Sequence, residues 1–221
     1  WDGTSIELES GKRVACFSAY NPSSEFFSQA ATMAKRTIEY FSKQMPGVFY
    51  PYPQITVFNG DGGMEFPMIV NDGQFSNKIN DVYVTTHEID HMYFPFYVGT
   101  NESRYAWMDE GMAYFLPWDL QIELSEYDHR TRATIGFSKW AGNEMDIPLI
   151  LPSVLSRDPH LSMMSYYKPA LAYNMLESAL GEELFAKGLK EFIARWNGKH
   201  PTPWDFFYTF EDVTKQDLNW F

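Results

Sequence analysis

The pentapeptide His87-Glu88-Ile89-Asp90-His91 lies in a segment whose apolar residues recur at helical spacing. Two histidines four positions apart share one helical face, about one turn from each other, so their ring nitrogens can converge on one cation. A glutamate beside the first histidine reaches a metal-bound water rather than the metal. Catalytic zinc sites typically have imidazole ligands and keep one coordination position of the metal open for water or substrate. The pentapeptide therefore predicts a zinc site on a helix.

The same five residues also have a simpler interpretation as the ordinary polar face of a helix, because short motifs occur by chance. A third ligand separates the two interpretations, since zinc held by two histidines needs another protein donor. Glu110 follows His91 after eighteen intervening residues. Between them Pro95 should end or kink the first helix, and Gly99-Thr100-Asn101 has the composition of a turn. A second helix, from Ser103, would then return Glu110 to the metal.

The neighbours of Glu110 indicate the environment of its carboxylate. Trp107, Met108, Met112 and Tyr114 surround it in the sequence and predict a largely buried setting. A buried charge needs a partner, and zinc would be one. The other interpretation of Glu110 is a solvated helix carboxylate.

Outward from this motif, the chain of 221 residues divides into a mixed first part and a helical second part. We expect one α+β domain, with a mixed α/β lobe over residues 1–84 and a helical lobe over 85–221. The mixed lobe should hold a helix through 27–41, a strand at 55–58 and a second short strand at 64–70. The segment at 141–165 should be largely irregular. The expected helices of the later part lie at about 82–94, 103–116, 119–140, 168–180 and 182–196.

Composition excludes some functional classes. The formal charge of -12, from 29 acidic and 17 basic residues, argues against a nucleic-acid binder or an anionic membrane surface as partner. No apolar run approaches the length of a membrane span, so no membrane insertion is expected. The single Cys16 cannot form an internal disulfide and leaves the compartment open. His129, His160 and His200 have no ligand spacing, and we expect them on the surface.

Two further segments flank the motif in a particular order. Residues 62–66 read Gly-Gly-Met-Glu-Phe, and residues 166–170 read Tyr-Tyr-Lys-Pro-Ala. With the pentapeptide and Glu110, this order resembles the M1 aminopeptidases, a gluzincin family, over most of residues 25–221. The resemblance implies a thermolysin-like catalytic domain that cleaves the N-terminal peptide bond of peptides. That family usually carries Asn where this chain has Phe66, so its substrate preference transfers less directly than its mechanism.

Carried over residue by residue, the resemblance implies one zinc ion per chain, bound by His87, His91 and Glu110. Glu88 would be the general base, which takes a proton from the attacking water and returns it to the leaving amine. Family members also carry an N-terminal β domain and a C-terminal helical domain. Neither is recognised in these 221 residues, so we expect missing domains of a parent chain to be partners.

The flanking segments would bind and polarise the substrate. The resemblance implies that Tyr166 donates its hydroxyl to the developing oxyanion and that Glu65 pairs with the free α-ammonium of the peptide. Independently of it, a glycine-rich turn before a short strand lets a peptide backbone approach, and a carboxylate there favours a charged amine. Gly62, Gly63 and Met64 would line the substrate site.

Two other functions remain open from the sequence. The same scaffold could serve a zinc endopeptidase, which would not require a free N-terminus. It could also be a catalytically silent domain that binds peptides. The leading prediction is a zinc-dependent aminopeptidase whose partners are peptides with a free N-terminus.

Overall fold

The computed structural model describes residues 1–24 and 27–221. The chain forms two compact units, and each is described by itself. Unit 1 consists of Trp1–Tyr93 and Pro117–Asp128, and unit 2 of Phe94–Leu116 and His129–Phe221. The expected lobe boundary at residues 84–85 falls inside helix α2 (Lys78–Asp90), which belongs whole to unit 1 because it packs against the other helices and the sheet of that unit.

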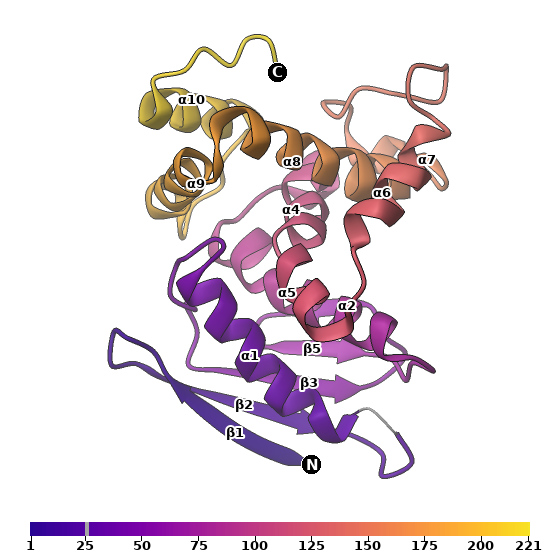
Figure 1. Ribbon diagram of the computed structural model, residues 1–221, viewed down its shortest axis with the longest axis vertical. Coiled ribbons are helices and arrows are strands. Elements are labelled where there is room, and N and C mark those ends of the chain that lie inside the picture. Colours follow the sequence, from indigo (N-terminus) through magenta and orange to yellow (C-terminus); the bar gives the residue numbers. More distant parts are fainter. Residues whose placement is uncertain (25–26) are drawn as a thin grey trace. The chain divides into compact units, whose positions relative to one another are not determined.

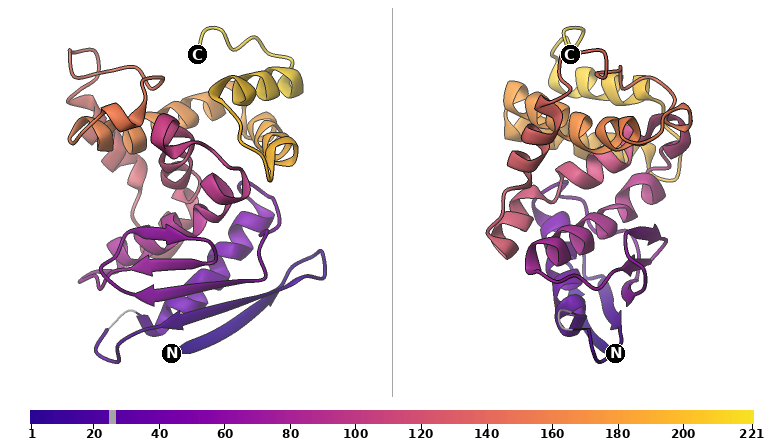
Figure 2. Two further views of the ribbon diagram at one scale, coloured as in Figure 1. Left: turned by 180° about the vertical axis from the view of Figure 1, so that it is seen from behind. Right: turned by 90° about the vertical axis from the view of Figure 1, so that its right-hand side faces the viewer.

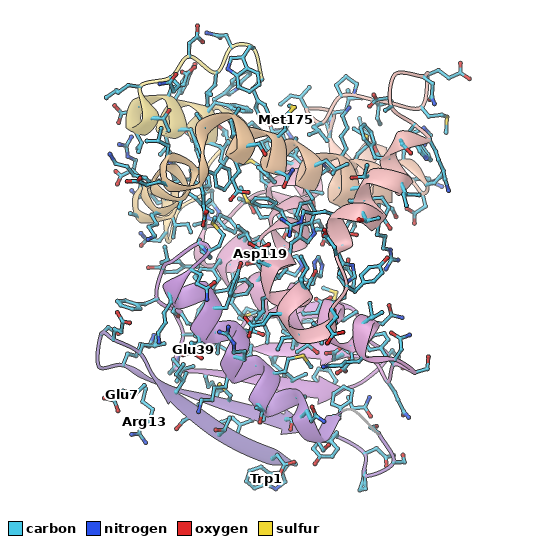
Figure 3. All side chains as sticks on the ribbon, in the orientation of Figure 1. Trp1, Glu7, Arg13, Glu39, Asp119 and Met175 are labelled. Carbon is cyan, nitrogen blue, oxygen red and sulfur yellow. The ribbon has the colours of Figure 1, made fainter. Side chains whose placement is uncertain are left out.

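Unit 1 is built on one five-stranded sheet in the order β1-β2-β3-β5-β4. The β1–β2 and β4–β5 pairs are antiparallel, and β2–β3 and β3–β5 are parallel. Glu7 and Arg13 form an exposed ion pair of 3.4 Å at the β1–β2 hairpin (Figure 3). The strands are β1 (Asp2–Glu7), β2 (Arg13–Ala19), β3 (Gln54–Asn59), β4 (Met64–Phe66) and β5 (Ile69–Asp72).

Helix α1 (Ala30–Lys43) covers one face of this sheet (Figure 1), and the view from behind in Figure 2 shows the strands in front of it. Its buried residues recur at helical spacing, as the sequence predicts, and include Ile38 and Phe41. α2 and α5 (Trp118–Ser125) pack together, and α2 also contacts α1, β4 and β5. The position of α2 against β4 matters for the candidate site.

The expected strand at 64–70 is two strands rather than one. Met68 has a positive φ of 65° and reverses the chain, so β4 and β5 pair as a tight antiparallel hairpin in which Glu65 lies opposite Val70. The sequence pattern missed this turn because Pro67-Met68 carries no glycine or asparagine.

Unit 2 is helical, as expected, and its core is aromatic. Phe206 lies at the centre, with its ring centroid 4.5 Å from that of Phe210 and 5.3 Å from that of Phe192. The segment 141–165 is mostly irregular, as expected. The helices are α3 (Glu102–Tyr105), α4 (Glu110–Phe115), α6 (His129–Ser138), α7 (His160–Ser162), α8 (Lys168–Leu180), α9 (Glu182–Trp196) and α10 (Pro203–Thr214).

The bounds of α8 and α9 match the expected helices, whereas two other expected helices need correction and one helix was not expected. The expected helix at 103–116 breaks at Asp109, whose backbone is non-helical, into α3, a 3-10 turn and α4. The expected helix at 119–140 is α5 and α6, because Glu126 adopts a left-handed conformation that ends α5. Helix α10 was missed, although Thr202 and Asp205 form a capping box around Pro203 at its first position.

None of the helices in the described part of the chain combines the length and apolar character needed to cross a lipid bilayer.

Candidate metal centre

Helix α2 presents the two histidines of the pentapeptide. The helix begins at Asn77, whose side chain accepts a hydrogen bond of 2.9 Å from the Asn80 backbone N–H. His87 lies in its last turn, and His91 follows directly after it with helical backbone angles. Both rings are buried, with 5% and 1% of their surface exposed. Their Nε2 atoms lie 3.3 Å apart, so the helical spacing brings the two nitrogens together as predicted.

This pair fits a metal ion. Zinc–nitrogen bonds of about 2.0–2.1 Å at tetrahedral angles place two ligand nitrogens about 3.3 Å from each other, and the Nε2 atoms of His87 and His91 have that separation. The ring of Tyr83 stacks on His87, with centroids 5.5 Å apart and an interplanar angle of 25°, and His91 meets His87 nearly edge-on. The two donor nitrogens therefore have the separation and the chemistry of a zinc site.

Two carboxylates of unit 1 lie beside His91. One ligand atom from each of Glu65, Glu88 and His91 lies within 4.8 Å of the others. Glu88 is buried on α2, and Glu65 is half-buried on β4. Because Glu65 is 23 positions from Glu88 in the sequence, only the packing of the β4–β5 hairpin against α2 brings the two carboxylates together.

The glycines before β4 have different constraints. Gly62 has a φ of +93°, and a Cβ there would lie 2.8 Å from the backbone nitrogen of Gly73. Gly63 has a φ of +66° and open space around it. Met64 is 44% exposed at the start of β4. Gly62 thus permits a close backbone approach after β5, whereas a Cβ at Gly63 would meet only open space.

Glu110 and Tyr166 belong to unit 2, where they contact each other. Glu110 is the first residue of α4, and Tyr166 lies in the π-helical turn Met163–Tyr167. The Tyr166 hydroxyl donates a hydrogen bond of 2.5 Å to Glu110 Oε1. The buried surround expected for Glu110 is confirmed, because Trp107, Met108, Met112 and Tyr114 are all buried.

The predicted site residues thus form two sets. The structure brings His87, His91, Glu88 and Glu65 together within unit 1, next to the turn that holds Gly62, Gly63 and Met64. It brings Glu110 and Tyr166 together within unit 2. The prediction that both sets act on one zinc ion stays a prediction.

Comparison with protein families identifies the chain. Residues 30–221 match the model of the peptidase family M1 domain, which is most of the sequence. The chain belongs to peptidase family M1. The resemblance drawn from the motifs is therefore confirmed. The chain carries a zinc metallopeptidase domain, and zinc metallopeptidases are hydrolases.

Curated relatives of this M1 domain are aminopeptidases. It is 27% identical over 143 residues to aminopeptidase N of Escherichia coli K12, a match that covers 60% of this chain and 16% of the relative. It is 24% identical over 204 residues to mitochondrial aminopeptidase 2 of Saccharomyces cerevisiae, covering 80% of this chain and 21% of the relative. The chain therefore spans about a fifth or less of these relatives.

A solved structure shares the fold. A crystal structure of a two-domain M1 zinc metallopeptidase bound to L-arginine aligns with a TM-score of 0.69 and 16% identity, over 96% of this chain and 48% of that one. At this identity the match establishes the fold alone. It confirms the expected α+β class, with a small mixed sheet followed by helices.

Two buried carboxyls of the M1 domain were not predicted as part of the site's surroundings. Burial, with smaller contributions from the charges of Asp81 and Glu88, raises the pKa of Asp72 to about 8, although hydrogen bonds from Thr85 and Gly73 lower it. The Thr85 hydroxyl donates to Asp72 Oδ2 over 2.5 Å. Burial also raises the pKa of Asp81 to about 6. No local pattern marks these carboxyls, because strand β5 and helix α2 bury them only after they pack.

The expectation for the remaining histidines was wrong at one position. His200 is exposed and His160 is half-buried, but His129 is fully buried at the start of α6. Its ring contacts Tyr114 edge-to-face, with centroids 6.5 Å apart. Ligand spacing in the sequence carries no information about such a packing role.

Proposed function

We propose that this M1 domain is a zinc-dependent aminopeptidase that hydrolyses N-terminal peptide bonds. The observation that carries the proposal is the buried Nε2 pair of His87 and His91 beside the carboxylates of Glu65 and Glu88. It combines a metal-binding pair with one carboxylate that can act as a base and one that can bind an amine.

One zinc ion per chain is proposed, held by His87, His91 and Glu110. The 3.3 Å separation of the two Nε2 atoms supports the histidine pair. The eighteen-residue spacing and the buried surround of Glu110 support the third ligand. When bound, zinc lowers the pKa of a water molecule and polarises the substrate carbonyl.

Glu88 is proposed as the general base. It is 4% exposed, and one of its carboxylate oxygens lies within 4.8 Å of a ring nitrogen of His91. A desolvated carboxylate takes up a proton more readily than one in water. Glu88 would accept the proton of the attacking water and return it to the amine that leaves.

Tyr166 is proposed to stabilise the oxyanion. Its hydroxyl is a donor, and in this structure that donor is directed at the Glu110 carboxylate. A hydroxyl donor of this kind can stabilise negative charge that develops on a substrate oxygen. The proposed step moves this hydrogen bond from Glu110 to the substrate.

Glu65 is proposed to bind the substrate's α-ammonium group. Its half-buried carboxylate belongs to an edge strand, beside the glycine turn that leaves room for a peptide backbone. A charge-assisted hydrogen bond to an ammonium group would distinguish a free N-terminus from a blocked one. Gly62, Gly63 and Met64 are proposed to line the adjoining substrate site.

The test is Glu88→Gln, with Glu9→Gln as a matched exposed control in unit 1. Purified proteins are assayed for zinc content and for hydrolysis of aminoacyl amides. We expect the parent and Glu9→Gln to hydrolyse these substrates, and Glu88→Gln to retain zinc but lose turnover. A parent protein that folds but binds no zinc, or a Glu88→Gln protein as active as the parent, would refute the proposal.

A further inference from the structure

Helix α4 contacts Tyr166 at two places. Glu110 and Tyr114 are four residues apart on α4, so their side chains share one helical face. Glu110 Oε1 accepts the hydrogen bond of the Tyr166 hydroxyl. The ring of Tyr114 meets the ring of Tyr166 edge-to-face, with centroids 6.4 Å apart and an interplanar angle of 84°. One face of one helix therefore holds both the hydroxyl and the ring of Tyr166.

Tyr114 is itself held in place. Only 1% of its surface is exposed. The ring of His129, which is fully buried, contacts it at 6.5 Å and 88°, and the ring of Tyr167 contacts it at 5.3 Å and 64°. Edge-to-face contacts of this kind favour one ring orientation over others. These contacts and its burial favour a single orientation of the Tyr114 ring.

The backbone around Tyr166 adds to this arrangement. Tyr166 and Tyr167 are consecutive in the π-helical turn Met163–Tyr167, a wide turn that is frequent at functional sites. The ring of Tyr167 lies directly over Gly136 of α6, where a Cβ would be only 2.6 Å from Tyr167 Cε2. Tyr167 therefore packs between Gly136 of α6 and Tyr114. Tyr114 contacts the rings of both consecutive tyrosines.

We propose that Tyr114 is a positioning residue, which sets the direction of the Tyr166 hydroxyl through ring contact. This inference rests on the proposed function, in which that hydroxyl stabilises the oxyanion. A hydrogen bond at the tip constrains only the hydroxyl, and that bond must be released when substrate binds. The ring contact with Tyr114 does not involve the hydroxyl, so it can keep the side chain aligned after the bond to Glu110 is released.

The first test measures ring order without any catalysis. Tyrosine rings are labelled with ¹³C, and because the chain has 14 tyrosines, the Tyr166 signal is identified by its loss in Tyr166→Phe. We expect an ordered Tyr166 ring in the parent and in Tyr114→Phe, which keeps the aromatic contact, and a disordered ring in Tyr114→Leu. A Tyr166 ring already mobile in the parent, or equally ordered in Tyr114→Leu, overturns the proposal.

The second test separates positioning from general destabilisation. For aminoacyl amides we expect kcat to fall about 10- to 100-fold in Tyr114→Leu with KM within about twofold, because small misplacements of reacting groups cost this much. Tyr114→Phe should retain most of the parent kcat. Phe192→Leu alters another buried aromatic of unit 2, which packs on Phe94 and Phe206, and should leave kcat and Tyr166 ring order unchanged.

The two proposals can fail separately. An equal loss of kcat in Phe192→Leu and Tyr114→Leu would show a general effect of core changes and would overturn the positioning role. A folded parent protein without turnover would refute the aminopeptidase proposal, whereas the ring-order measurement would still decide whether Tyr114 aligns Tyr166.

Discussion

The hydroxyl of Tyr166 donates a hydrogen bond of 2.5 Å to Oε1 of Glu110, although 56 positions separate the two residues in the sequence. The contact joins the π-helical turn Met163–Tyr167 to the first residue of α4. It pairs a proposed zinc ligand with a proposed oxyanion donor, and it identifies the hydroxyl as the group whose removal is most informative.

Tyr166→Phe removes that hydroxyl and keeps the ring. We expect kcat for aminoacyl amides to fall by about 10²–10³, the usual effect of losing one oxyanion donor, while zinc content stays at the parent level. Tyr208→Phe is the matched control, because Tyr208 is 65% exposed on α10. Unchanged kcat in Tyr166→Phe would remove Tyr166 from the reaction.

Replacement of either ligand histidine should abolish tight zinc binding. Changes in outer-shell partners alone cost 10- to 100-fold in metal affinity, so we expect His87→Ala and His91→Ala to lose more than about 100-fold. The measurement is zinc affinity by competition with a chelating dye. His200→Ala, at an exposed histidine, should bind zinc as the parent does. Parent-like affinity in both ligand variants would place the metal elsewhere.

Glu65→Gln should reduce the preference for free N-termini. A hydrogen bond to a charged group contributes about 1.5–3 kcal/mol, so loss of the carboxylate charge should cut kcat/KM for free peptides by roughly 10- to 100-fold. The same peptides with acetylated N-termini should be affected far less. If the parent cleaves both kinds of peptide equally well, the endopeptidase alternative is favoured over the aminopeptidase.

Asp72 should make the folded protein less stable as pH rises. The pKa of its carboxyl is about 8 in the folded protein, against 3.8 for an ordinary aspartate, so between these values the unfolded chain releases a proton that the folded state retains. The free energy of unfolding should therefore fall with increasing pH in this window, by up to about 1.4 kcal/mol per pH unit from this group.

The test of this prediction is Asp72→Asn, which removes the titrating group. Urea unfolding at pH 5 and pH 8, with chelator present throughout, should show that the variant is more stable relative to the parent at pH 8 than at pH 5. Asp61→Asn, at an exposed aspartate, should follow the parent at both values. Parallel pH dependence of Asp72→Asn and the parent would contradict the raised pKa.

The two glycines before β4 should respond differently to alanine. Gly62→Ala combines a positive φ with a Cβ 2.8 Å from the Gly73 backbone, whereas Gly63→Ala meets only the positive φ. We expect a loss of about 1–2 kcal/mol in the free energy of unfolding for Gly63→Ala and a larger loss for Gly62→Ala. Thermal or urea unfolding checks the order, and a smaller effect at Gly62 would contradict the close approach.

Local signals in the sequence predicted much of the fold. The periodic runs at 168–180 and 182–196 became α8 and α9 with those bounds, because each run carries its own apolar face. Two of the predictions that were wrong concern residues with a positive φ that are neither glycine nor asparagine. Met68 and Glu126 adopt positive φ values, which methionine and glutamate rarely take. One expected strand is therefore a hairpin, and one expected helix is two helices.

Some features of the candidate site follow from the local sequence, and others depend on tertiary packing. The sequence by itself determined the His87–His91 pair, because spacing by four in a helix sets the distance between side chains without any other part of the fold. Only the tertiary structure decided that Glu65 lies beside Glu88 and that Tyr166 bonds to Glu110. Those contacts join segments far apart in the chain, and their geometry depends on how the hairpin and helices pack, which local spacing does not encode.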